Sequence, residues 1–288
     1  MPSRFRTHNS FFDKSFAAGN TADYYLCLQT GTKSISYSVF NPGTKKFIVL
    51  ESFISADTKP GDETTGLKYL LDEKTWLKQP FSKVFLIIDN PYSTLIPPPL
   101  FNEEEAMMYL SYNHPVDDHY TARFNQLRTA GIVTVFGMTK TLTELAEETW
   151  NNINYKHCSS VIIESLLINY KNKADNNTLF LNVRDGGFDL VYFKNNKLHF
   201  HNFFRYNTKE DFIYFLLTTV EELQLNPEQL KLMLSGEIDK SSILYEMIYR
   251  YIRSIAFVDR NEVFGYSYLM DELMGHKQYT LFNVLICE

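Results

Sequence analysis

Residues 178–204, TLFLNVRDGGFDLVYFKNNKLHFHNFF, contain three short β-rich runs at 178–183, 188–193 and 197–204. The turn sequences Arg184-Asp185-Gly186-Gly187 and Asn195-Asn196 separate these runs. Turns of this composition join strands that are antiparallel neighbours. The segment therefore predicts three consecutive antiparallel strands.

The same arrangement occurs near the start of the chain. Residues 24–29, 34–40 and 47–53 are again β-rich, and Thr30-Gly31-Thr32-Lys33 and Asn41-Pro42-Gly43-Thr44 separate them. In each half a helix and a further strand follow, at residues 65–78 and 83–88 and at residues 209–223 and 230–234. This repeated order indicates two related lobes. We expect a flexible lead at residues 1–20, a first lobe at residues 21–172 and a second lobe at residues 173–288.

A proline-rich stretch interrupts the first half. Residues 89–99 include Pro91, Pro97, Pro98 and Pro99, so this stretch is neither a helix nor an inner strand. It precedes Asn102, which is suited to cap a helix that runs through Tyr112. Three interpretations of the stretch stay open: a rigid covering loop, a peptide-recognition surface, or the site of an enzyme of an unrelated kind.

The composition restricts the function classes. The 288 residues are 44% hydrophobic, 22% charged and 15% aromatic, which is typical of a globular protein with substantial sheet. The charges are well mixed and sum to −6, so we expect no nucleic-acid partner. The three cysteines are far apart and predict no disulfide framework. No signal-peptide pattern occurs and the longest apolar run, residues 84–88, is short, so we expect a cytoplasmic protein without direct membrane insertion.

Common catalytic motifs are absent from the sequence. It has no P-loop motif, no G-x-G-x-x-G, no G-x-S-x-G and no H-E-x-x-H. His199 and His201 share one face of a predicted strand, and His114 and His119 lie in a polar connection, but neither group has the spacing of a metal site. We therefore predict no metal site.

Three glycine-centred turns occupy equivalent places in the two halves. They contain Gly31, the pair Gly186-Gly187, and Gly236 in the sequence Leu234-Ser235-Gly236-Glu237. The backbone N–H groups of such turns can surround phosphate oxygens, although each turn also has a purely structural interpretation.

These features resemble the actin, sugar-kinase and heat-shock chaperone superfamily. Residues 162–170 and 179–190 are similar to the interlobe helix and second phosphate hairpin of the chaperones. Residues 93–101, 201–212 and 234–238 resemble an uncharacterised bacterial family of unknown function, and the resemblance spans residues 20–288. It implies an α/β, two-lobed actin-like ATPase (ribonuclease H-like) fold, in which each lobe is a mixed five-stranded sheet with helices.

The sequence departs from the active members of that superfamily. The resemblance implies an Asp at the position of Gln29 and another at Asn182, and an amide is a poor substitute for a carboxylate as a ligand of Mg²⁺. The bulky Arg184 and Asp185 replace small residues of the second hairpin. We therefore expect no catalytic residues and no metal-assisted phosphoryl transfer.

Nucleotide binding without hydrolysis remains open, so no cofactor is expected and ATP is the ligand to test. The candidate contacts are Gly31, Thr32, Lys33, Ser34, Arg184, Gly186, Gly187, Ser235 and Gly236. The leading hypothesis is a non-catalytic scaffold or regulator that binds an unidentified protein, by analogy with pilus-assembly and secretion proteins of the superfamily. The alternative is a nucleotide-binding protein or weak phosphotransferase that uses Lys33 and Arg184.

Overall fold

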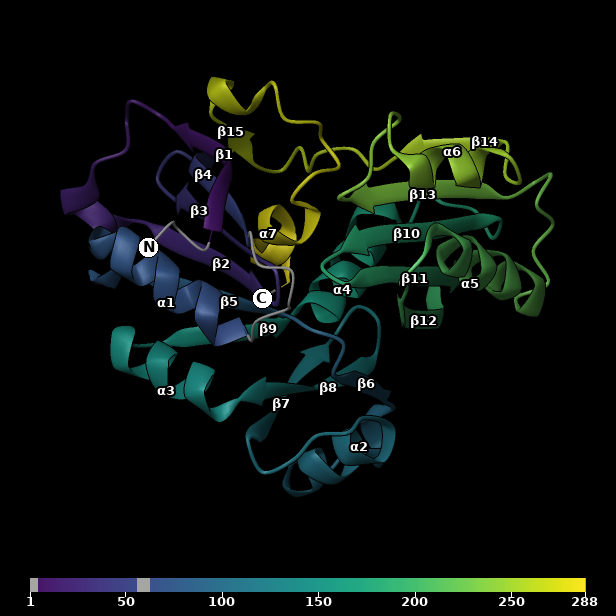
Figure 1. Ribbon diagram of the computed structural model, residues 1–288, viewed down its shortest axis with the longest axis horizontal. Helices are drawn as coiled ribbons and strands as arrows, with labels where there is room; N and C mark the ends of the chain where they lie inside the picture. Colours follow the sequence, from purple (N-terminus) through teal and green to yellow (C-terminus); the bar gives the residue numbers. More distant parts are fainter. Residues whose placement is uncertain (1–4, 56–62, 288) are drawn as a thin grey trace.

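The chain forms two lobes and a smaller inserted sheet (Figure 1). The computed structural model describes residues 5–55 and 63–287. In this part of the chain, no helix is both long and apolar enough to cross a membrane.

The first lobe is built on a mixed sheet with helices on both faces. Its strands follow the order β1-β4-β3-β2-β5-β9, and β15 pairs with β4. Their bounds are β1 (Phe5–Phe12), β2 (Tyr25–Gly31), β3 (Ser34–Asn41), β4 (Lys46–Ser55), β5 (Lys83–Asp89), β9 (Ile153–His157) and β15 (Gly265–Tyr266). Helices α1 (Glu63–Glu73) and α3 (Lys140–Thr149) pack on one face, and α4 (Cys158–Tyr170) and α7 (Tyr279–Asn283) pack on the other. Because both faces are covered, β5 is an almost continuous apolar run.

The second lobe repeats the topology of the first. Its strand order is β12-β11-β10-β13-β14, which matches β4-β3-β2-β5-β9 position by position. The bounds are β10 (Thr178–Arg184), β11 (Gly187–Lys194), β12 (Lys197–Arg205), β13 (Lys231–Gly236) and β14 (Ser254–Phe257). Helices α5 (Lys209–Glu222) and α6 (Ile243–Tyr249) cover one face, and α4 packs against the other. Helix α4 thus lies in a core shared by the two lobes.

A three-stranded antiparallel sheet is inserted into the first lobe, at the bottom of Figure 1. It contains β6 (Ser93–Ile96), β7 (Tyr120–Leu127) and β8 (Ile132–Thr139) in the order β6-β8-β7, with α2 (Ala106–Asn113) packed against it. The proline-rich stretch supplies β6, which is an edge strand. This agrees with the prediction that the stretch is neither a helix nor an inner strand.

The predicted domain limits differ from the structure at both ends of the chain. The expected flexible lead contains β1, which pairs with β4, and the Phe5 ring of β1 is buried against Tyr69 at a centroid distance of 4.8 Å. Residues 1–4 lie outside the described residues. At the other end, β15 and α7 leave the second lobe and pack on the first. The first sheet therefore has the expected five strands plus β1 and β15.

A substitution of Phe282 tests whether the C-terminal segment packs against the first lobe. Its ring is buried and lies 4.9 Å from the ring of Phe47, between centroids. Phe282→Ala should lower the free energy of unfolding by about 3–5 kcal/mol, because it opens a cavity in this core. Tyr214→Ala, at a side chain that is 63% exposed, should change it by no more than about 0.5 kcal/mol. Chemical denaturation measures both, and equal effects would contradict this packing.

Candidate functional site

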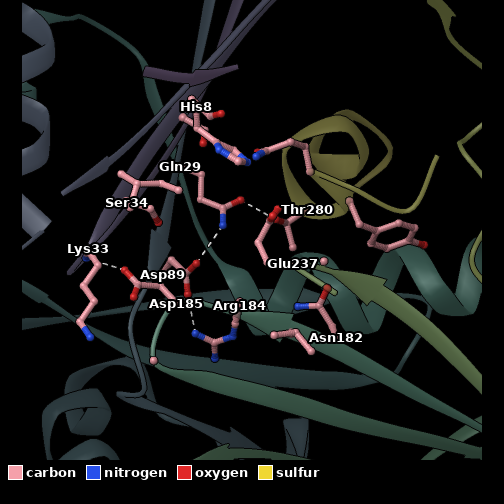
Figure 2. A pocket seen from close by; sticks show the side chains of 18 of the residues that line it. His8, Gln29, Lys33, Ser34, Asp89, Asn182, Arg184, Asp185, Glu237 and Thr280 are labelled. Carbon is pink, nitrogen blue, oxygen red and sulfur yellow. Dashed lines mark hydrogen bonds and ion pairs between the residues drawn. The ribbon is translucent and has the colours of Figure 1, made fainter. Parts of the chain in front are cut away.

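A cavity of about 340 Å³ lies between the lobes (Figure 2). Strands β2 and β5 run parallel and end at this cavity, and so do the parallel strands β10 and β13 of the second lobe. Side chains at the carboxyl ends of parallel strands meet at one sheet edge, which is where open α/β sheets bind ligands. The duplicated topology thus brings two such edges face to face.

Arg184 occupies the centre of the contact between the lobes. Its Nη1 donates to Asp89 Oδ1 at 2.5 Å and to the Asn90 carbonyl oxygen at 3.2 Å. Its Nε and Nη2 donate to the two carboxylate oxygens of Asp189, at 2.7 and 3.3 Å. The guanidinium also stacks 3.8 Å from the Phe203 ring centroid. Because Asp89 belongs to the first lobe and Asp189 to the second, this buried arginine joins the lobes.

The electrostatics of this cluster keep Arg184 charged. Burial alone would lower the pKa of Arg184, but the carboxylates of Asp189 and Asp89 raise it above its usual value. Burial would raise the pKa of Asp189, yet Arg184 and His201 hold it below the usual range. Burial raises the pKa of Asp89 to about 6 despite the attraction of Arg184. Arg184 thus makes two hydrogen bonds to the Asp189 carboxylate and one to that of Asp89.

The Asp185 side chain, from the second lobe, contacts the first β-hairpin, which is formed by β2 and β3. Its Oδ2 accepts a hydrogen bond from the backbone N–H of Lys33 at 2.5 Å and lies 3.5 Å from Thr32 Oγ1. A Cβ added at Gly31 would lie only 2.7 Å from this oxygen, so the glycine leaves room for the carboxylate. Backbone N–H groups at such turns bind anions, and here the anion is a side chain of the same protein.

The two amides at the expected acid positions make internal hydrogen bonds. Gln29 Nε2 donates to Asp89 Oδ2 at 2.9 Å, and Gln29 Oε1 accepts a bond from the Thr280 hydroxyl (Figure 2). Asn182 Oδ1 accepts a bond from Ser235 Oγ at 2.9 Å. Both amide side chains therefore line the cavity while they are hydrogen-bonded to other residues of the protein.

His157 is a buried neutral group next to this network. Its Nδ1 accepts from the Ser159 backbone N–H at 3.2 Å, and its Nε2 donates to the Asn90 carbonyl at 3.1 Å. These two partners together define the neutral tautomer with the proton on Nε2. Burial, together with the charge of Arg184, lowers the pKa of His157 to about 3.

The predicted nucleotide contacts divide into two groups. The cavity lining includes Lys33, Ser34, Arg184, Gly186 and Gly236. The remaining predicted residues make internal contacts: Gly31 and Thr32 adjoin Asp185, Ser235 bonds to Asn182, and Gly187 pairs with Arg205 in the β11–β12 ladder. Arg184 also belongs to the second group through its ion pairs.

The sequence prediction missed Asp89, Asp185 and the lining residues His8, Ser36, Gln278 and Thr280. Asp89 had a usable signal, because it ends a buried parallel strand. In the sequence, Asp185 is distinguished only as a replacement for a small residue in the second hairpin. His8 and Thr280 come from opposite ends of the chain, and no local pattern relates those ends to the cleft.

The residues present do not fit the Mg²⁺–nucleotide complex that the resemblance implies. In the described ranges, no group of three or more His, Cys, Asp or Glu side chains could hold a metal ion. Asp89 and Asp189 are both bonded to Arg184, whereas Mg²⁺ needs accessible carboxylate oxygens.

The lowered pKa of His157 predicts that the stability of the protein depends on pH. The unfolded chain binds a proton near pH 6.5 and the folded chain only near pH 3, so this residue should reduce stability as the pH falls from 6.5 toward 3. His157→Asn keeps an acceptor at the start of α4 and cannot titrate there. The difference in unfolding free energy, variant minus wild type, should therefore rise with acidification over this window. A difference that is independent of pH would contradict the assignment.

A double-mutant cycle tests the contact of Asp185 with the first hairpin. Gly31→Ala should destabilise the wild type because its Cβ meets the Asp185 carboxylate, and it should cost less in an Asp185→Gly background. The expected coupling is about 0.5–3 kcal/mol. Gly19→Ala is the matched control, because nothing lies within 4 Å of a Cβ added there. A coupling at Gly31 no larger than at Gly19 would refute the contact.

Similar folds occur among solved structures. A protein with an actin-like ATPase fold and unknown function from Bacteroides thetaiotaomicron matches with a TM-score of 0.78 and 24% identity, over 95% of this chain and 99% of that chain. The PilM–PilN type IV pilus biogenesis complex matches with a TM-score of 0.64 and 14% identity, over 92% of this chain and 98% of that chain. The chain therefore has the actin-like ATPase fold, and the predicted fold class is confirmed.

No curated protein matches the chain significantly. A family described as "Protein of unknown function (DUF3822)" matches residues 13–255. This confirms the resemblance to an uncharacterised family with an actin-like fold, and the chain belongs to the DUF3822 family.

Proposed function

We propose that this protein is a non-catalytic scaffold or regulator that binds another protein in the cytoplasm. The observation that carries the proposal is the occupation of the interlobe contact by the protein's own side chains. The Asp185 carboxylate is bonded to a backbone N–H of the first hairpin, and Arg184 forms ion pairs with both buried aspartates, Asp89 and Asp189. These interactions take up the groups that would otherwise bind phosphate and metal.

The charge around the cavity also supports this proposal. Its lining includes the carboxylates of Asp89, Asp185 and Glu237 and the cations Lys33 and Arg184. Asp189 adds a further buried carboxylate behind Arg184. The cluster therefore has an excess of negative charge, which repels a triphosphate.

The hydrophobic core extends through both lobes, and we therefore propose a binding role rather than an enzyme that has lost its activity. The two sheets and the shared helix α4 form a continuous buried core. A structural relative, PilM, is known from a complex with PilN, so this fold does serve protein association elsewhere. We extend that role to this chain by analogy of fold.

A second candidate is nucleotide or sugar-phosphate binding in the remaining cavity. Its volume of about 340 Å³ and the presence of Lys33, Ser34 and Gly236 in its lining favour this alternative. Binding of this kind would use the cavity beside Arg184 and would not require a metal.

Ligand titration separates the two candidates. Thermal-shift measurements with ATP, ADP and sugar phosphates should show no saturable stabilisation of the wild type. A ligand present at about 100 times its Kd would add about 2.7 kcal/mol, which is readily detected. ATP turnover with Mg²⁺ should also stay at the level of the buffer.

Two results would overturn the scaffold proposal. One is ATP hydrolysis that Gln29→Ala or Asn182→Ala abolishes, because these residues would then act in catalysis. The other is a saturable nucleotide shift that Ser34→Trp, at a half-buried position of the cavity lining, removes, which would support the second candidate. Lys197→Trp, at an exposed position of β12 outside the cavity, controls for a general effect of the added indole.

A further inference from the structure

A second groove, of about 350 Å³, lies between the inserted sheet and the second lobe. One wall is formed by Ser93, Thr94 and Leu95 of β6, and the other by His201, Asn202 and Phe203 of β12. Consecutive residues of a strand point to opposite faces of its sheet. Because three consecutive residues of each strand line the groove, both strands present their edges to it.

Both strands lie at an edge of their sheet. Strand β6 is outermost in the order β6-β8-β7, and β12 is outermost in β12-β11-β10-β13-β14. Within residues 5–55 and 63–287, no backbone hydrogen bond joins the outer edge of β12 to another strand. Such an edge is a template for a further strand. Pro91 and Pro97 bound the exposed edge of β6, so only a short segment of it is available.

Both walls are held rigid by contacts behind them. On the β12 side, Phe203 stacks on the Arg184 guanidinium and His201 Nε2 lies 3.1 Å from Asp189 Oδ1. On the β6 side, His114 Nε2 donates to the Ser93 carbonyl at 2.9 Å, and Asn113 Nδ2 donates to Thr94 Oγ1 at 2.9 Å. A preformed groove loses less conformational entropy when it binds a partner.

The charges of the groove favour an acidic occupant. None of the described residues that line it carries a carboxylate, although the whole chain has a net charge of −6. Arg205, at the end of β12, lies 5.7 Å from the Tyr92 ring centroid and has no ion-pair partner in the described part of the chain. A side-chain carboxylate at one end of a bound peptide would therefore find a free guanidinium.

We propose that an extended, acidic segment of a partner protein binds in this groove and adds as a strand to the free edge of β12. Backbone hydrogen bonds to β12 supply affinity, and the side chains of the β6 wall and Arg205 select the sequence. This inference rests on the proposed function, because it locates the protein-binding surface of the scaffold. It also assigns a use to the proline-rich stretch that supplies β6.

Selection from a phage-displayed library of short random peptides on the full chain provides the probe. The selected peptide, made synthetically and labelled with fluorescein, is then titrated by fluorescence anisotropy. We expect the selected sequences to contain Asp or Glu. We also expect hydrogen–deuterium exchange to slow at residues 93–96 and 198–204 when the peptide is bound.

Asn202→Trp is the test variant, because Asn202 is exposed, lines the groove and makes no side-chain hydrogen bond in the described structure. It should weaken the peptide by about tenfold or more, whereas the matched control Lys197→Trp on the same strand should not. Arg205→Glu should weaken acidic peptides in the same assay. Thermal unfolding of each variant verifies that it is folded.

The inference is overturned if no peptide is selected, if Asn202→Trp and Lys197→Trp bind equally well, or if protection appears only around the interlobe cavity. These outcomes are distinguishable from failure of the proposed function. ATP turnover together with peptide protection at β12 would refute the non-catalytic role and retain the groove. Absence of both would retain the non-catalytic role and refute the groove.

Discussion

A guanidinium buried between two carboxylates from different lobes is the interaction on which the interlobe structure depends. Arg184 is only 3% exposed at its side chain, and its partners Asp89 and Asp189 are 2% and 0% exposed. A buried ion pair of this kind adds little net stability relative to apolar packing, but removal of one partner leaves a costly unpaired charge. Its consequence is therefore geometric: the two lobes must meet so that both carboxylates reach one arginine.

The remaining features of the cleft follow from this constraint. With Arg184 at the end of β10, the next residue, Asp185, reaches the backbone of the first hairpin, and Gly31 is needed there for space. Gln29 is bonded to the same Asp89 that Arg184 binds. Phe203 lies under the guanidinium and so couples the cleft to the wall of the β6–β12 groove. One polar cluster thus connects the interlobe cavity, the first hairpin and the outer edge of β12.

Local sequence patterns predicted the parts of the fold that depend on near neighbours. The three β-rich runs after residue 24 and after residue 178 became the corresponding hairpins, because their turn residues and apolar content are local properties. The helix expected over residues 209–223 begins at residue 209, where the adjacent Thr208 forms a capping box with Asp211. In contrast, β1, β9 and β15 are short or polar, and their strand conformation depends on pairing with distant partners.

By itself, the sequence predicted two related lobes with glycine-centred turns at equivalent places, and its resemblance to the actin-like superfamily marked Gln29 and Asn182 as positions where acids are expected. Only the tertiary structure decided what fills that cleft. Asp185 and Asp189 have no distinguishing signal in the linear chain, and Asp89 is marked only by its place at the end of a buried strand. Nothing local indicates that Arg184 will contact Asp89 and Asp189. The physical reason is that charge pairing in a buried site is set by which strand ends meet in space. The same holds for the groove between β6 and β12, because its walls, residues 93–95 and 201–203, are far apart in the sequence.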